Sequence, residues 1–192
     1  MVGTERSEAI GEQGRGHATV DDLYKVHGKA ELVGGELIIM SPTGFQPSRS
    51  AGCIYRSLCE YERKTRRGYA MPDNAAYIVD LPSRRSFSPD ASFYVGPPTG
   101  GKFMNGAPVF AAEVRSEGDY GPAADKRLAA KRADYFAAGT QLVWDVDVLR
   151  EEVVRVHAAD RPDAPRICRR GQAAEAEPAV PGWSMPVDDL FE

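Results

Sequence analysis

Two carboxylates stand at apolar, strand-like segments of the sequence, where a charged side chain is costly to bury. Glu113 interrupts the segment PVFAAEVRSEGD, in which the apolar residues 109–112 precede it and Val114 follows it. An apolar run of this length suits a strand that is covered on both faces. An ionised carboxylate in such a strand must meet a cation or a metal ion. Asp90, in the segment SPDAS, stands where a second strand-like segment, ASFYV, begins.

Asp90 and Glu113 could together hold a divalent metal ion. If their strands are neighbours, both carboxylates can point to one side at one end of the sheet. Mg²⁺ and Mn²⁺ prefer hard oxygen ligands of this kind, with positions left open for water and phosphate. A structural alternative stays open for each residue, because SPD is also an ordinary turn motif and Glu113 could pair with a nearby Arg or Lys.

A lysine on the predicted helix over residues 122–138 could act beside these carboxylates. At about 100° per residue, Leu128 and Tyr135 define the apolar stripe of this helix, and Lys131 lies about 60° from it. Arg132, about 40° away on the other flank, is a rival, and the ammonium of Lys131 could instead extend into water. Two acids and a lysine suggest metal-assisted phosphodiester hydrolysis, in which the metal lowers the pKa of a bound water.

The elements that must position these residues follow from the spacing of apolar and turn residues. AELVGGELIIM predicts a hairpin around Gly34 and Gly35, and residues 48–67 predict a helix with a basic last turn, ERKTRRG. Strands are expected at AAYIVDL, SFSPDASFYV and PVFAAEV, and after the helix over 122–138 at TQLVWDVDV and EEVVRVH. This order predicts an α/β or α+β fold with a mixed sheet flanked by helices.

Length, charge and composition exclude several classes of protein. The chain has 192 residues, a net charge of −4 and three cysteines without CxxC spacing. We expect a disordered leader at residues 1–17 and one domain over residues 18–192. The acidic balance gives no general attraction to nucleic acid, so a local basic patch would have to supply it. The cysteine spacing and three scattered histidines indicate no zinc site.

The sequence also lacks membrane and export signals. No stretch approaches the roughly 20 apolar residues of a membrane-spanning helix. The polar N-terminus MVGTERSEAIGEQGRG has no apolar signal-peptide core. We therefore expect a soluble, cytoplasmic protein.

Five segments in a fixed order resemble the Uma-two family of restriction-endonuclease-like proteins, part of the PD-(D/E)XK nuclease superfamily. They are ELVGGELIIMSPTG, SPDASF, PVFAAEVRS, KRADYFAAGTQLVWDVD and VPGWSMPVDDLF, and the resemblance runs from residue 20 to the C-terminus. It implies a restriction-endonuclease-like core with a central mixed sheet. It also implies a metal-dependent DNA endonuclease with Mg²⁺ or Mn²⁺ as cofactor, and a possible homodimer.

The resemblance assigns roles to individual residues. Asp90 matches the first acid of the superfamily and Glu113 the second, so both would hold the metal ion. Lys131, on the helix that follows, would position the nucleophile. Glu31 in AELVGGE matches an early acid that could complete the metal shell, and Glu36 is the weaker choice for this role.

The sequence departs from the family pattern in two places. Arg115 stands where the superfamily usually has Lys; a guanidinium cannot act as a base, but it could clamp a phosphate. Family members often carry His after the SPTG-like turn, where this chain has FQPSRS, so Gln46 or Arg49 could take that place. The acid–acid–lysine set is retained, which favours a catalytically competent site over an inactive one.

Other functions remain open alongside the nuclease hypothesis. A catalytically inactive nuclease-fold module could bind nucleic acid or a protein partner. In an unrelated fold, Glu113 and Lys131 would form only a buried ion pair. The basic helix end RKTRRG and the pair Arg84 and Arg85 are candidate contacts to phosphates, or simply solvated charge.

Overall fold

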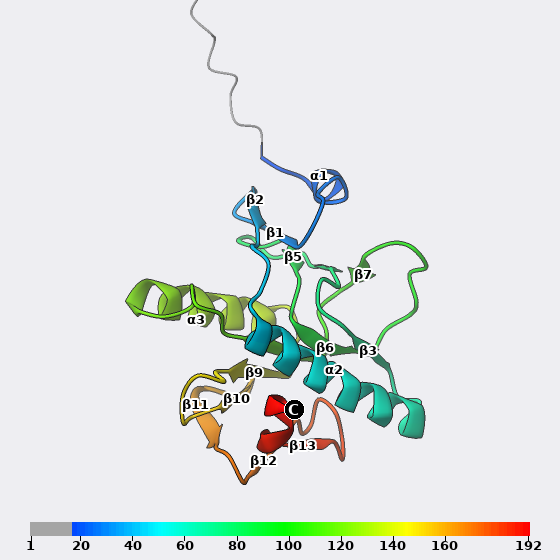
Figure 1. Cartoon of the computed structure of the whole chain (residues 1–192). Helices are drawn as coiled ribbons and strands as arrows, with labels where there is room; N and C mark the ends of the chain where they lie inside the picture. The colour runs from blue at the N-terminus through cyan, green and yellow to red at the C-terminus, as the bar shows by residue number, and fades with distance from the viewer. Residues whose placement is uncertain (1–16) are drawn as a thin grey trace, which may run out of the picture.

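A six-stranded mixed sheet forms the centre of the molecule (Figure 1). The computed structural model describes residues 17–192, so the predicted leader, apart from its last residue, lies outside the described residues. Its strands are β3 (Tyr69–Met71), β6 (Ala91–Tyr94), β8 (Phe110–Val114), β9 (Leu142–Val146), β10 (Val154–Ala158) and β11 (Arg161–Cys168). Their order in the sheet is β11-β10-β9-β8-β6-β3. β8 and β9 run parallel, and each other neighbouring pair is antiparallel.

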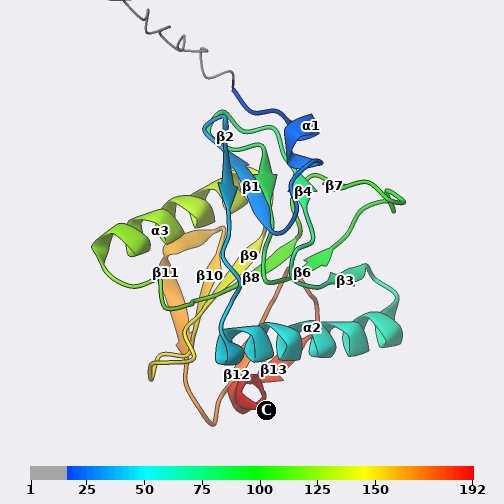
Figure 2. The ribbon, with the colours of Figure 1, turned by 45° about the horizontal axis from the view of Figure 1, so that its top comes forward.

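Two helices cover opposite faces of this sheet (Figure 2). Successive side chains of a strand point to opposite faces. In β8, Phe110 and Ala112 belong to the core cluster beneath α2 (Phe45–Thr65), whereas Ala111 packs with Tyr135 of α3 (Pro122–Ala137). Glu113 stands two residues after Ala111 in the strand and therefore also points to the α3 face. This confirms the predicted mixed sheet with flanking helices.

The helices follow the predicted segments closely, with physical reasons for each boundary. In α2, Ile54, Leu58 and Tyr61 form the buried stripe at helical spacing. The helix ends at Thr65, two residues before the predicted end, because Arg66 adopts the left-handed C-cap conformation (φ 56°). α3 begins with Pro122 at its first turn, where a missing N–H is tolerated, and supplies the crossover that the parallel strands β8 and β9 require.

The predicted hairpin is present at the start of the described chain. β1 (Ala30–Val33) pairs with β2 (Glu36–Ile39) around Gly34 and Gly35, whose φ angles of 59° and 78° suit a type I′ turn. A short helix, α1 (Val20–Leu23), precedes it. The strands in the predicted segments AAYIVDL and SFSPDASFYV are shorter than expected. The first segment forms β4 (Tyr77–Ile78), and the second forms β5 (Ser86–Phe87) and β6. A further short strand is β7 (Met104–Asn105).

The C-terminal part of the chain covers the α2 side of the sheet. Trp183 stacks on Trp144 of β9 with ring centroids 5.0 Å apart. The small elements here are β12 (Ala173–Glu175), β13 (Ser184–Pro186) and the 3-10 helix η1 (Val187–Phe191). None of the described helices is both long and apolar enough to cross a membrane.

Candidate active site

Charged side chains form a row across the central sheet on the α3 face. Continuing the β6–β8 register by one residue places Asp90 opposite Glu113. Glu113 pairs with Asp145 on β9, and Asp145 pairs with Arg155 on β10. Residues at paired positions of neighbouring strands point to the same face of the sheet. The row therefore brings three carboxylates and one guanidinium together, with Asp90 and Glu113 as direct neighbours.

The backbone fixes the orientation of Asp90. The N–H of Asp90 donates to the carbonyl of Ala112 at 3.1 Å, which extends the ladder by one bond beyond β6. The N–H of Val114 then donates to Oδ2 of Asp90 at 2.7 Å. Since the carboxylate itself takes the place of the next ladder acceptor, its second oxygen is directed into the charged cluster.

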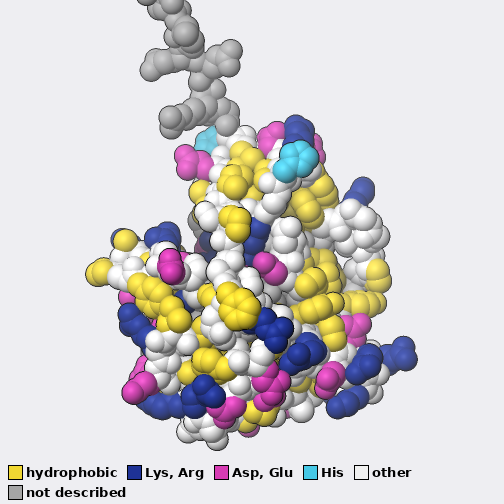
Figure 3. Space-filling model, viewed as in Figure 1, with side chains coloured by type: hydrophobic (Ala, Val, Ile, Leu, Met, Phe, Trp, Pro, Cys, Tyr) yellow, Lys and Arg dark blue, Asp and Glu magenta, His cyan; other side chains and the backbone are white. Residues whose placement is uncertain are grey.

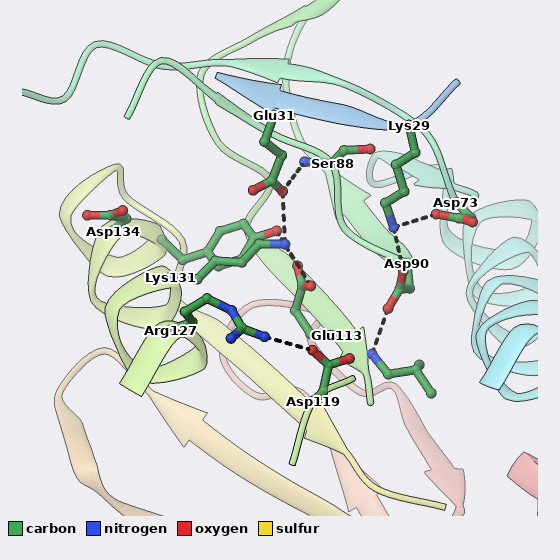
Figure 4. Close-up of polar contacts among 12 residues, drawn as sticks. Lys29, Glu31, Asp73, Ser88, Asp90, Glu113, Asp119, Arg127, Lys131 and Asp134 are labelled. Carbon is green, nitrogen blue, oxygen red and sulfur yellow. Dashed lines mark hydrogen bonds and ion pairs between the residues drawn. The ribbon is translucent and has the colours of Figure 1, made fainter. Parts of the chain in front are cut away.

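Lys131 bridges two carboxylates from different parts of the fold (Figure 4). Its ammonium lies 2.7 Å from Oε2 of Glu113 and 2.8 Å from Oε1 of Glu31, and its side chain is 14% exposed. The rival cation, Arg132, contacts Asp145 instead, at 3.5 Å. The structure thus brings three of the four predicted catalytic residues into direct contact, and Asp90 lies beside them.

Glu31 is the more buried of the two acids considered for the early position. Its Oε2 accepts a hydrogen bond from Nη1 of Arg84 at 2.5 Å, and its Oε1 accepts one from the N–H of Ser88 at 2.8 Å. Glu36, in contrast, lies on β2 as an exposed residue, away from this cluster. Hence Glu31, and not Glu36, is placed where it can act on the bridging lysine.

Two further residues of the cluster were missed by the sequence reasoning. Lys29 donates to Oδ1 of Asp90 at 2.5 Å and to Oδ1 of Asp73 at 2.7 Å. Tyr135 donates its hydroxyl proton to Oε1 of Glu113 at 2.7 Å. One signal for Lys29 was available in the sequence. Lys29 stands two residues before Glu31, and residues two positions apart in an extended segment point to the same face. Nothing in the sequence around Asp73 pointed to this contact.

The electrostatics assign different protonation behaviour to the acids and the lysine. Burial raises the pKa of Glu113; the ammonium of Lys131 opposes this, while Asp90 and Glu31 add to it. Burial also disfavours the charged form of Lys131, but the carboxylates of Glu113 and Glu31 outweigh it and raise the lysine pKa. Lys131 is therefore an ammonium at neutral pH, suited to donating hydrogen bonds and not to accepting a proton.

Arg115 and Arg84 are used inside the fold. Nε and Nη2 of Arg115 form a forked pair with the carboxylate of Asp145 at 2.7 and 2.8 Å, and Nη1 lies 2.9 Å from Asp125. Arg84 is buried between Glu31 and Asp134. This geometry favours a structural role over the phosphate contact considered for each of them, because the guanidinium donors already face carboxylates.

The remaining candidate contacts differ in whether the structure leaves them free. Gln46 and Arg49, considered for the place of the family's histidine, bind the backbone carbonyls of Leu190 and Glu192 near the C-terminus. The basic end of α2, in contrast, stays exposed, and Lys and Arg side chains gather over this part of the surface (Figure 3). Its exposed cations are Arg63, Lys64, Arg66 and Arg67.

The donor set suits a metal ion with few protein ligands. Among residues 17–192, no group of three or more His, Cys, Asp or Glu side chains is placed to hold a metal ion. Mg²⁺, however, is usually held by one or two carboxylates, with waters and substrate phosphates completing its shell. The neighbouring carboxylates of Asp90 and Glu113 meet this requirement. In addition, the connected ion pairs contain five carboxylates and three cations, which leaves an excess of negative charge (Glu31, Asp73, Asp90, Glu113 and Asp134 against Lys29, Arg84 and Lys131).

Comparisons with known proteins agree with this fold. The family model described as "Uma2: Putative restriction endonuclease" matches residues 20–188. The chain is also similar to the crystal structure of a putative nuclease belonging to DUF820 from Anabaena variabilis ATCC 29413, with a TM-score of 0.71 and 17% sequence identity. This match covers 90% of the present chain and 97% of the other, and it shows a common fold. A comparison with curated proteins finds no match.

Proposed function

The chain belongs to the Uma2 family of putative restriction endonucleases, and from this membership we propose that it is a metal-dependent endonuclease acting on DNA. The observation that carries the proposal is the neighbouring pair Asp90 and Glu113, with the ammonium of Lys131 on Glu113. This is the acid–acid–lysine set, assembled at one end of the central sheet on one of its faces.

Asp90 and Glu113 would hold Mg²⁺ or Mn²⁺, each through a carboxylate oxygen. When bound, such an ion lowers the pKa of a coordinated water and stabilises negative charge on the phosphoryl group. The residues of the chain do the positioning: Asp90 is fixed by the backbone N–H of Val114, and Glu113 by the hydroxyl of Tyr135. A pre-set arrangement of this kind reduces the reorganisation needed during reaction.

Lys131 would orient the attacking water and offset the charge that develops on the phosphate. Its raised pKa keeps it protonated, so it donates hydrogen bonds and does not take up the proton of the water. Glu31 holds the ammonium in place from the side opposite Glu113. Glu31 is thus a positioning residue that acts through Lys131, and its own carboxylate is kept ionised because Lys131 and Arg84 outweigh burial and lower its pKa.

One observation favours a second function, a nuclease-fold module that binds nucleic acid or a protein without turnover. Each proposed metal ligand already has a lysine partner, since Lys131 pairs with Glu113 and Lys29 with Asp90. Ion pairs of this kind can serve the fold alone. In that case the exposed cations at the end of α2 would still give salt-dependent binding of nucleic acid.

Calorimetric titration of Mg²⁺ and Mn²⁺, together with a plasmid-nicking assay, separates these functions. The variants are Asp90→Asn and Glu113→Gln, and Glu36→Gln is the matched control because it removes an acid of the hairpin outside the cluster. We expect the wild type and the control to bind the metal and nick DNA, and the two site variants to do neither while remaining folded by circular dichroism.

Two outcomes would contradict the proposal. Metal binding by the wild type without nicking of any DNA would support the binding module. Absence of metal binding by the folded wild type would assign Asp90 and Glu113 to structural ion pairs.

A further inference from the structure

A cleft of about 270 Å³ adjoins the candidate active site. It lies between the first half of α2, which contributes Pro47, Gly52 and Tyr55, and the turn after β3, which contributes Asp73. Asp90 also lines it. In Figure 4, Asp73 and Asp90 lie on the side of the cluster toward α2, whereas Lys131 lies on the side of α3. The cleft and the proposed metal pair therefore share one residue, Asp90.

The walls of the cleft suit an uncharged, flat group better than a phosphate. Pro47, Ala51 and Pro72 give it apolar walls, Tyr55 adds an aromatic ring, and Ser48 adds a hydroxyl group. Among the described residues that line it there is no Lys or Arg. Lys29 pairs with both Asp73 and Asp90, so these two carboxylates keep one net negative charge, which disfavours an anion. A nucleobase has the required chemistry, because its face stacks on apolar and aromatic groups while its edge makes hydrogen bonds.

The position beside Asp90 then specifies which nucleotide the cleft would receive. A phosphate near Asp90 and Glu113 has its neighbouring nucleoside within reach of the cleft. In a duplex the faces of each base are covered by the stacked neighbours, so only an unpaired base can place its face against the walls of the cleft. Resting on the proposed function, we infer that this cleft takes the unpaired base next to the scissile phosphate. The substrate is therefore a single-stranded or locally unpaired strand.

Gly52 offers a way to close the cleft without disturbing the fold. Gly52 is exposed on α2, and a Cβ at this position would meet no heavy atom within 4 Å. The variant Gly52→Trp therefore attaches a large ring to the wall of the cleft through a Cβ that meets open space. Ala133→Trp is the matched control, because Ala133 is an exposed residue of a helix that does not line the cleft.

The test measures binding of fluorescein-labelled DNA by anisotropy, without added metal and with Ca²⁺. The three probes are a 12-mer single strand, its duplex, and a strand of the same length with abasic residues throughout. We expect the wild type and Ala133→Trp to bind the normal single strand about tenfold more tightly than the abasic strand. Gly52→Trp should bind these two strands equally, and its affinity for the duplex should match that of the wild type.

Three results would overturn the inference. They are a Gly52→Trp variant that still prefers the normal strand tenfold, a wild type that does not distinguish normal from abasic DNA, and a wild type that prefers the duplex. Because the readout is binding, it is independent of turnover. A wild type that shows the base-dependent binding but cleaves nothing with Mg²⁺ would refute the proposed nuclease and leave the cleft assignment intact. If binding did not depend on the bases and Gly52→Trp left plasmid nicking unaffected, the cleft assignment would be refuted and the proposed nuclease would stand.

Discussion

Replacing Lys131 by Met tests whether this lysine holds the cluster together. The substitution keeps most of the side-chain volume and removes the charge that Glu31 and Glu113 share. Leaving a buried charge without its partner costs about 3–5 kcal/mol. We place the loss at about 3 kcal/mol, at the lower end of that range, because Glu31 keeps Arg84 and the N–H of Ser88.

Most of this loss should arise at Glu113. In the variant, Glu113 keeps the hydrogen bond that the hydroxyl of Tyr135 donates to it. The pKa of Glu113 is already raised, and loss of the ammonium raises it further. A carboxyl group whose pKa is higher in the folded than in the unfolded protein favours folding more as the pH falls toward its unfolded value of 4.5. The destabilisation should therefore shrink from about 3 kcal/mol at pH 8 to about 1 kcal/mol near pH 5.

Urea denaturation followed by circular dichroism at the two pH values measures both effects. At pH 8 the melting temperature should also fall by about 6–12 °C. The double variant Lys131→Met with Glu113→Gln should recover most of the lost stability, because no unpaired carboxylate remains at that position. A loss below 1 kcal/mol, or an equal loss at pH 5 and pH 8, would refute the reasoning.

Four further outcomes follow from the contacts described above. Arg115→Lys keeps the charge but loses the forked pair with Asp145, so we expect about 1.5–3 kcal/mol less stability by urea denaturation. Tyr135→Phe removes a buried hydrogen bond to a carboxylate and should cost about 1.5–3 kcal/mol in the same assay. Gly52→Ala should instead stabilise the protein by about 0.5–1 kcal/mol, since the added Cβ meets open space in a helix. Replacing the four exposed cations of residues 63–67 by Ser should reduce the slope of log K against log salt for duplex DNA by up to about 3.6.

The parts of the site that the sequence predicted are those that break a local pattern. Glu113 is an acid in an apolar strand, and Lys131 lies near the apolar stripe of its helix, so each stands out within its own segment. Such a signal needs no knowledge of the neighbouring strands. The same reasoning located the two main helices and the hairpin.

The remaining parts depend on pairings between distant segments. Arg115 looked available for phosphate because its partner, Asp145, lies on β9, and only the register of the sheet brings the two together. Lys29 gained its role from Asp73, a residue in a turn after β3. β11 was not predicted, because Pro162 and Pro165 suggest a loop, yet an edge strand tolerates proline where its N–H is not needed.

The bridge from Lys131 to Glu31 also bears on how the protein is made. It joins two segments about 100 residues apart in the sequence, and contacts at such separations form late because a long loop must first be closed. During synthesis the carboxylates of the hairpin leave the ribosome long before the lysine of α3 exists. A chain released before α3 is complete would carry Glu31 and Glu113 without their shared cation. If the proposed cleavage takes place, we expect incomplete chains to be inert and full-length, folded chains to be the ones that cleave.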